Sequence, residues 1–162
     1  MECRRILLVH PHADTREMYT EFLSHRGLHI VAVGDGNDAL RAAADADLIV
    51  TDINVPGIDG IELITRLRND ERMKRTPIIV LTAWVFPNDR MRAEHAGCDV
   101  CLSMPCLPDD LLHQIRLLLK VVGEMRPTIV TLKGAEALGP AVFNPSRTTR
   151  SGHPRRHRTT SK

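Results

Sequence analysis

The sequence contains few aromatic residues, so a core must be built mainly from aliphatic side chains. Only 3% of the 162 residues are Phe, Trp or Tyr. Hydrophobic residues nevertheless make up 43% of the chain and charged residues 26%, a composition typical of globular domains. The length suits one domain with an appendage better than two domains. A chain that is disordered throughout is therefore excluded.

Long apolar runs are also missing. No run approaches the roughly 18 residues of a membrane-spanning helix, and the N-terminal run at 6–9 is too short for a secretory signal. The four cysteines, Cys3, Cys98, Cys101 and Cys106, are too few and too clustered for a disulfide framework. We therefore predict a cytoplasmic protein with reduced cysteines and no membrane association.

Positive charge is concentrated in the last part of the sequence. Residues 1–123 carry 14 Lys and Arg against 18 Asp and Glu, whereas residues 124–162 carry 8 against 2. The sequence predicts a domain over 1–123 and a basic, mostly disordered tail over 124–162, in which 128–132 is a candidate for order by docking on the domain. The Arg-rich end of the tail lacks interleaved aromatic residues, so we do not expect nucleic-acid binding.

Short apolar runs alternate with amphipathic stretches along residues 1–123. The runs 6–9, 30–33, 48–51, 78–81 and 100–102 predict parallel strands. Helices are predicted from a capping box at Asp14 and Glu17 to Gly27, at 37–44, 61–68 and 88–96, and from Pro108 onward, where the apolar stripe includes Val122. This (βα)5 order predicts an α/β fold, a doubly wound five-stranded parallel sheet with helices on both faces.

Polar residues follow several of the predicted strands. Asp52 directly follows the third strand in a turn rich in Pro and Gly, and Thr82 follows the fourth. The loop after the first strand supplies His10, Pro11 and His12. Because the carboxyl ends of parallel strands meet at one rim, we expect a site there.

Five segments of the sequence together form a recognisable pattern. They are 6–9, 52–60, 76–83, 97–99 and 103–105, and they follow one another in the order and spacing of a known family. Over roughly residues 4–122 the sequence resembles the CheY-like receiver domain of bacterial response regulators. The resemblance implies the flavodoxin-like receiver fold and a two-component phosphorelay, in which a histidine kinase donates a phosphoryl group to an aspartate that also binds Mg²⁺.

The resemblance assigns roles to four matching residues. Asp52 matches the phosphoacceptor, and Thr82 matches the hydroxyl residue that contacts the phosphoryl oxygens. Asp52 and the main-chain carbonyl of Asn54 match ligands of Mg²⁺, and Pro105 matches a cis-proline. Asp52 and Thr82 are therefore the catalytic candidates, and Asp52 and Asn54 are the metal-binding candidates.

Other positions depart from the family. His10 and Pro11 replace an acidic pair, Met104 replaces a lysine, and Cys101 replaces an aromatic switch residue. Mg²⁺ prefers oxygen ligands, proline offers no side-chain donor, and imidazole suits Zn, Cu or Ni better. A thioether supplies no cation for a phosphoryl group. We therefore expect weak Mg²⁺ binding and impaired phosphoryl transfer.

Two other groups of residues are interpreted as structural. His10 and His12 are expected to be ordinary surface-loop histidines. Cys98, Cys101 and Cys106 have the spacing of half a metal site, but without a second pair we interpret them as small core side chains.

The sequence thus predicts a single-domain receiver, not an enzyme, that accepts a phosphoryl group at Asp52 from a histidine kinase or phosphotransfer protein. No output domain fits in 124–162, so a downstream protein partner is expected, with the apolar loop 84–87 as a candidate surface. The alternative is a pseudo-receiver that binds partners without phosphorylation. A different flavodoxin-like ligand binder or enzyme would need a Gly-rich loop after the first strand, where residues 10–13 contain no glycine.

Overall fold

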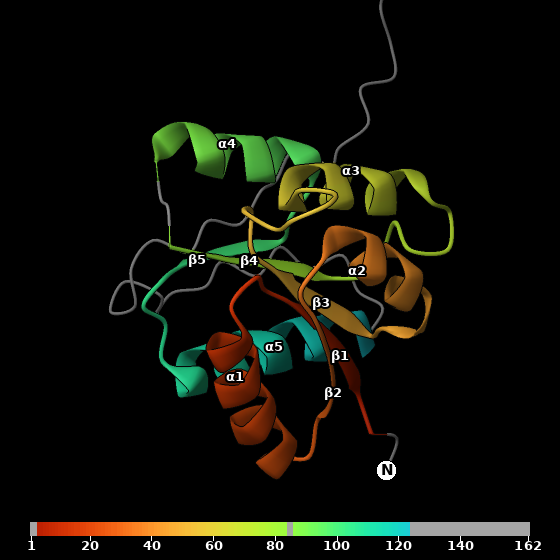
Figure 1. Ribbon diagram of the computed structural model, residues 1–162. Helices are drawn as coiled ribbons and strands as arrows, with labels where there is room; N and C mark the ends of the chain where they lie inside the picture. Colours follow the sequence, from red (N-terminus) through yellow and green to blue (C-terminus); the bar gives the residue numbers. More distant parts are fainter. Residues whose placement is uncertain (1–2, 84–85, 124–162) are drawn as a thin grey trace, which may run out of the picture.

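The fold is a three-layered α/β arrangement around one parallel sheet. The computed structural model describes residues 3–83 and 86–123. The strands are β1 (Arg5–Val9), β2 (His29–Val33), β3 (Leu48–Thr51), β4 (Ile78–Thr82) and β5 (Val100–Ser103). They pair in the order β2-β1-β3-β4-β5, and every pairing is parallel (Figure 1). The predicted (βα)5 doubly wound sheet is confirmed.

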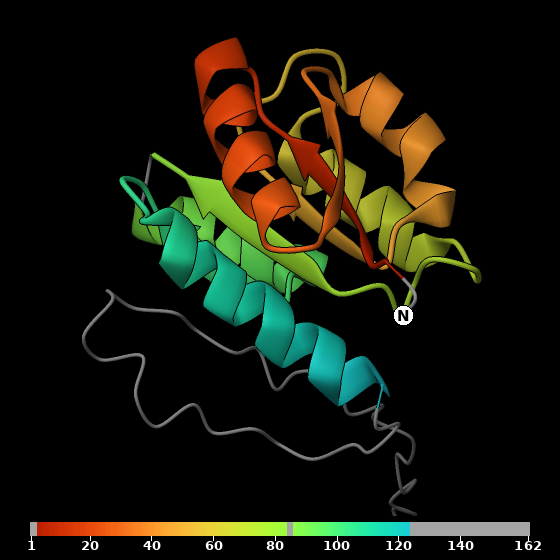
Figure 2. The same cartoon turned by 90° about the horizontal axis from the view of Figure 1, so that it is seen from below.

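Helices cover both faces of the sheet. They are α1 (Ala13–His25), α2 (Gly36–Ala42), α3 (Gly60–Asn69), α4 (Pro87–Ala96) and α5 (Pro108–Gly123), and a 3-10 turn, Ala43–Asp45, follows α2. The helices α2, α3 and α4 lie on one face, and α1 and α5 lie on the other (Figures 1 and 2). Every residue of β3 and β4 is buried, as expected for apolar strands that are covered on both sides.

The core consists of two clusters, one on each face of the sheet. The first joins Leu7, Ile49 and Val80 to the buried sides of α3 and α4. The second packs Tyr19 of α1 and Leu111 of α5 against the opposite sides of the same strands. Because successive side chains of a strand point to opposite faces, each central strand contributes to both clusters. The rim at the carboxyl ends of these strands is consequently held on a rigid base.

Two details of the predicted helices are wrong. The N-cap of α1 is His12, without a side-chain capping bond, and Asp14 lies inside the first turn. The capping box is absent because the chain enters the helix before Asp14, whose carboxylate still suits the positive end of the helix dipole. Val122 is 48% exposed rather than part of the buried stripe, because α5 extends beyond its buried part at Leu111, Leu112 and Ile115.

Some predictions fall outside the described residues, namely those on Trp84 and Val85 and on the tail at 124–162. Among the residues that are described, no helix has the length and apolar character needed to cross a membrane.

Candidate functional site

Asp52 lies at the carboxyl end of β3 and is only 6% exposed. Its backbone N–H donates to the carbonyl of Val9 on β1 at 3.0 Å, which fixes the main chain. Its carboxylate Oδ1 accepts a 2.6 Å hydrogen bond from the backbone N–H of Ile53. A Cβ at residue 60 would lie 2.1 Å from the main-chain oxygen of Asp52, so only a glycine at the start of α3 allows the helix to approach Asp52 this closely. The carboxyl group is therefore held in one orientation.

The other carboxylate oxygen of Asp52 faces His10. The His10 Nε2 atom lies 3.8 Å from Asp52 Oδ2, and His10 is only 4% exposed. The backbone N–H of His12 donates to His10 Nδ1 at 3.2 Å. An imidazole nitrogen that accepts a hydrogen bond carries no proton, so in the neutral ring the proton is on Nε2, toward Asp52. Burial lowers the pKa of His10, and the Asp52 carboxylate opposes this effect.

The expectation that His10 is an ordinary surface-loop histidine is wrong. The sequence places His10 directly after the first predicted strand and Asp52 directly after the third, but the contact between them follows only from the strand order and register. The two strands are neighbours, and their register pairs Val9 with Thr51. The next residue on each strand must therefore lie at the same place on the rim, where both are buried.

Arg16 is a residue near the site that the sequence analysis missed. Its guanidinium Nη1 donates to the carbonyl oxygens of His10 at 2.6 Å and Pro11 at 2.9 Å. A Cβ at Gly34 would lie 2.8 Å from the same nitrogen. Arg16 thus ties α1 to the loop after β1 and places a permanent positive charge beside it.

Thr82 and Asn54 differ in their surroundings. Thr82 is buried at the end of β4, and its carbonyl accepts a 2.8 Å hydrogen bond from the N–H of Met104. Since β3 and β4 are neighbours, Thr82 and Asp52 lie at the same rim. Asn54 is an exposed residue of the loop between β3 and α3. The roles assigned to both residues stay predictions.

Met104 and Pro105 follow β5. The peptide bond between them is cis, which agrees with the expectation for Pro105. The sulfur of Met104 lies 3.5 Å from the hydroxyl oxygen of Tyr19, which donates to the carbonyl of Cys106 at 2.7 Å. Met104 also packs against the cluster under α1 and α5. The position at which the family has a lysine is therefore integrated into apolar packing.

Comparison with known proteins identifies the family of this fold. The model of the response regulator receiver domain matches residues 6–116. The chain belongs to the response regulator receiver domain family. It is 38% identical over 127 residues to the transcriptional regulatory protein HprR of Escherichia coli K12, covering 77% of this chain and 56% of that protein. It is 34% identical over 118 residues to the response regulator Rre1 of Synechocystis, covering 70% and 51%. The receiver domain thus spans about half the length of these relatives.

Solved receiver domains share the fold. The chemotaxis response regulator CheY4 of Vibrio cholerae is 28% identical with a TM-score of 0.67, covering 72% of this chain and 98% of that one. The receiver domain of the sensor histidine kinase PA1611 of Pseudomonas aeruginosa is 28% identical with a TM-score of 0.68, covering 73% and 98%. The PA1611 structure has a magnesium ion coordinated in its active-site cleft.

Receiver domains typically bind Mg²⁺ at this place, but the donor set of this receiver domain differs. Next to Asp52 stands the buried imidazole of His10, and Pro11 has no donor atom in its side chain. Within the described ranges, no group of three or more His, Cys, Asp or Glu side chains is arranged to hold a metal ion. Because Mg²⁺ prefers oxygen ligands in octahedral geometry, the residues around Asp52 do not fit it.

The cysteines occupy different surroundings. All four are free thiols. Cys98 and Cys101 are buried in the cluster beneath α3 and α4, Cys106 is half-buried and Cys3 is exposed. Cys98 and Cys101 are therefore core side chains, as interpreted from the sequence.

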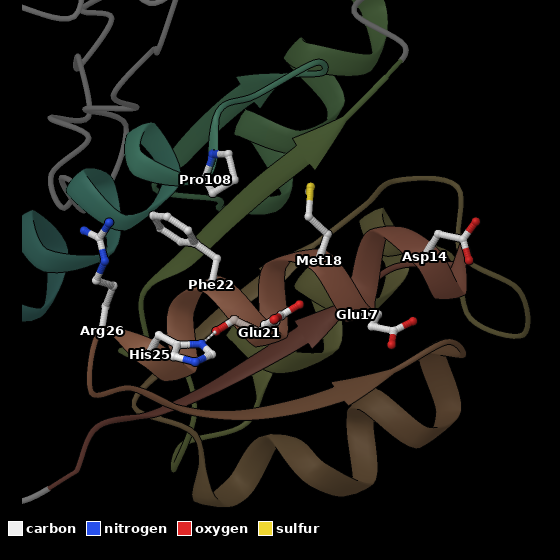
Figure 3. A pocket seen from close by; sticks show the side chains of 8 residues that line it. All are labelled: Asp14, Glu17, Met18, Glu21, Phe22, His25, Arg26 and Pro108. Atoms are coloured by element: carbon white, nitrogen blue, oxygen red, sulfur yellow. Dashed lines mark hydrogen bonds between the residues drawn. The ribbon is translucent and has the colours of Figure 1, made fainter.

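A groove of about 660 Å³ runs along α1 beside the start of α5 (Figure 3). Its lining alternates acidic and apolar side chains of α1, including Glu17, Met18, Glu21 and Phe22, and Pro108 closes it from the α5 side. The guanidinium of Arg26 lies 4.5 Å from the centre of the Phe22 ring. The groove therefore offers acidic and apolar side chains, with His25 and Arg26 at one end, along the helix α1 that begins at the rim.

Proposed function

We propose that this receiver domain accepts a phosphoryl group on Asp52 and signals through contacts with other proteins. The observation that carries the proposal is the Asp52 carboxylate at the end of β3, with Oδ1 fixed by the N–H of Ile53 and Oδ2 directed toward His10. A carboxylate held in one orientation is suited to attack phosphorus, since phosphoryl transfer depends mainly on positioning and on stabilising charge.

The source of the phosphoryl group is proposed to be a histidine kinase or a phosphotransfer protein of a two-component pathway. The groove along α1 supports this, because α1 begins at Ala13 beside the rim and offers both carboxylates and apolar side chains to a helix of another protein. Phe86 and Met91 are 58% and 52% exposed at and near the start of α4. They are proposed to contact the downstream protein partner, since exposed large apolar residues often form interaction surfaces.

A second candidate function is a pseudo-receiver that binds partners without phosphorylation. The observation in its favour is that Met104 packs into the apolar layer where the family has a lysine. In that case Asp52 has only a structural role, through its hydrogen bonds with Val9 and Ile53. The single-domain organisation and the cytoplasmic location stay predictions under both functions.

The two functions are separated by intact-mass measurement after incubation with phosphoramidate, with and without Mg²⁺. We expect the addition of one phosphoryl group to the parent and none to Asp52→Asn. Asp45→Asn is a matched control, because Asp45 is an exposed carboxylate in the 3-10 turn after α2, and it should be labelled like the parent. A folded parent that remains unlabelled in both conditions contradicts phosphoryl acceptance and favours the pseudo-receiver.

A further inference from the structure

His10 stands beside Asp52, where the family resemblance places one residue of an acidic pair. We propose that the Nε2–H of His10 is a hydrogen-bond donor to the phosphoryl group that Asp52 accepts, and that phosphoryl transfer here proceeds without a divalent cation. This inference rests on the proposed function, and it assigns to a neutral protein group the task that Mg²⁺ performs in related domains. Three features of the rim support it.

The first feature is the direction of the donor. The N–H of His12 occupies His10 Nδ1 at 3.2 Å, which leaves the ring proton of the neutral imidazole on Nε2. Nε2 lies 3.8 Å from Asp52 Oδ2, which is too long for a direct hydrogen bond. The non-bridging oxygens of a phosphoryl group on Oδ2 are only two bonds from that atom. One of them can therefore accept from Nε2–H across the existing gap.

The second feature is the rigidity of His10. Its backbone N–H donates to the carbonyl of Val33 on β2 at 3.1 Å, and its own carbonyl accepts from Arg16 at 2.6 Å. The side chain is buried against Asp52. A donor that is already oriented stabilises developing charge without reorganisation during the reaction. In a site with little water, such a donor stabilises negative charge more strongly than the same group does in solvent.

The third feature is charge near the rim. The guanidinium of Arg16 is a cation that donates hydrogen bonds to the carbonyls of His10 and Pro11. It is a positioning residue here, because it acts on His10 through the main chain. Its charge also offsets part of the negative charge that a phosphoryl group brings to the loop.

The covalent step needs no other reactant than the phosphodonor. With phosphoramidate, a lone pair of Asp52 Oδ2 forms the new O–P bond while the P–N bond breaks. The electron pair of that bond goes to nitrogen, which leaves as ammonia because it already carries three protons in the zwitterion. The carboxylate has no proton to lose. His10 keeps its Nε2 proton throughout and donates only a hydrogen bond.

The test compares rates of phosphoramidate labelling in excess EDTA, followed by intact mass. The parent should be labelled in EDTA, and Mg²⁺ should change its rate little. His10→Leu, which removes the donor, should be labelled about tenfold more slowly or worse, the usual loss when a hydrogen bond to a charged group is removed. His10→Gln, which retains an amide N–H, should recover part of the rate. His113→Gln is the matched control, because His113 is exposed on α5, and its rate should equal that of the parent.

A second readout reports the hydrogen bond itself. In the ¹H–¹⁵N spectrum of the imidazole groups, the Nε2 resonance of His10 should shift on labelling of the parent and remain unchanged in Asp52→Asn treated with phosphoramidate. A role in folding alone would not move this signal on labelling. The spectrum also decides the question if circular dichroism shows that His10→Leu is unfolded.

The outcomes separate this inference from the proposed function. Labelling of Asp52 that requires Mg²⁺ and is unaffected by His10→Leu overturns the role of His10, while phosphoryl acceptance stands. An Nε2 resonance that is unchanged in the labelled parent overturns it as well. A parent that is not labelled with or without Mg²⁺ overturns both.

Discussion

At the scale of single residues, the site follows from the neighbours of Asp52 along the rim rather than from Asp52 alone. His10 and Asp52 are the first residues after two adjacent strands, and both are buried. A buried carboxylate needs partners that offset the loss of water. The N–H of Ile53 is such a partner for Oδ1, while the ring of His10 lies 3.8 Å from Oδ2. The replacement of the family's acidic residue by His10 is thus a change of chemistry at a retained position.

Restoring the family's residues should change the dependence on metal. The variant combining His10→Asp, Pro11→Asp and Met104→Lys supplies carboxylates that suit Mg²⁺ and a cation for the phosphoryl oxygens. We expect phosphoramidate labelling that requires Mg²⁺ and exceeds that of the parent, measured by intact mass. Without Mg²⁺ the clustered carboxylates should lower the unfolding midpoint in urea, because like charges repel. Labelling that persists after Asp52→Asn is added would place the reaction at another residue.

The thiols should differ sharply in reactivity at pH 8. Burial, followed by the neighbouring Cys101 and Asp99, raises the pKa of Cys98 to about 12, and burial also raises the pKa of Cys101. The thiolate is the reactive form, so iodoacetamide should modify exposed Cys3 first and Cys98 and Cys101 only after unfolding. Peptide mass mapping measures this order. Rapid labelling of Cys98 in the native protein would contradict its place in the core.

The same shift has a consequence for stability at alkaline pH. A thiol whose pKa is raised by folding favours the folded state at pH values below 9, its ordinary pKa, and this contribution declines as the pH rises toward about 12. The urea midpoint of the parent should therefore fall more steeply between pH 9 and pH 11 than that of Cys98→Ala. Equal slopes for the two proteins would show that Cys98 does not contribute.

At the scale of elements, Arg68 connects α3 to three other parts of the fold. Its guanidinium donates to Thr76 O at 2.7 Å and Gly97 O at 2.8 Å, and pairs with Asp99 at 2.9 Å. Asp99 in turn accepts from the N–H of Ile78 at 2.8 Å. One buried cation thus joins α3, the end of α4 and the starts of β4 and β5.

Replacing Arg68 should lower the free energy of unfolding substantially. In Arg68→Met the carbonyls of Thr76 and Gly97 and the carboxylate of Asp99 lose a shared donor, and the loss of one partner from a buried pair costs about 3–5 kcal/mol. We expect about 2–4 kcal/mol in the free energy of unfolding by urea, because Asp99 is only half-buried. Arg66→Met is the control. Arg66 forms an exposed pair with Glu62 one turn away on the same helix, so its loss should cost less than about 1 kcal/mol. Equal effects would show that burial does not distinguish the two arginines.

An element could be predicted well where a local residue pattern defines it, and poorly where contacts with other parts of the chain define it. Apolar runs such as 48–51 and 78–81 reported burial on both faces, and the strands lie there. The predicted start of α1 was wrong because Asp14 and Glu17 keep the spacing of a capping box even though the N-cap is His12. The contacts of Arg16 with His10 and Pro11 could not be predicted, since a side chain bonded to main-chain carbonyls leaves no residue pattern.

At the scale of the whole molecule, the site depends on the order of the strands. The order β2-β1-β3-β4-β5 places β1, β3 and β4 side by side in the sheet, and these strands bring His10, Asp52 and Thr82 to the rim. The expected (βα)5 pattern implied that the strand order reverses within the sheet and that a site lies near this reversal. No single motif, however, specified that the residue after β1 would face Asp52. That contact combines strand order with register, and it became evident only when both were known.

The distribution of charge and core residues leads to a prediction about the chain as a whole. Among the residues that the structure describes, both core clusters are made from residues between 6 and 119. Residues 124–162 carry 8 Lys and Arg against 2 Asp and Glu. If the tail contributes nothing to the core, a chain ending at residue 123 should unfold at the same urea concentration as the full chain and be labelled by phosphoramidate at the same rate. Limited proteolysis of the full chain should likewise stop near Arg126. A truncated chain that is less stable by more than about 1 kcal/mol, beyond the usual effect of a distant surface change, would show instead that part of the tail packs on the domain. The segment 128–132 would be the first to test, by replacing Ile129 and Val130 with Ser in the full chain.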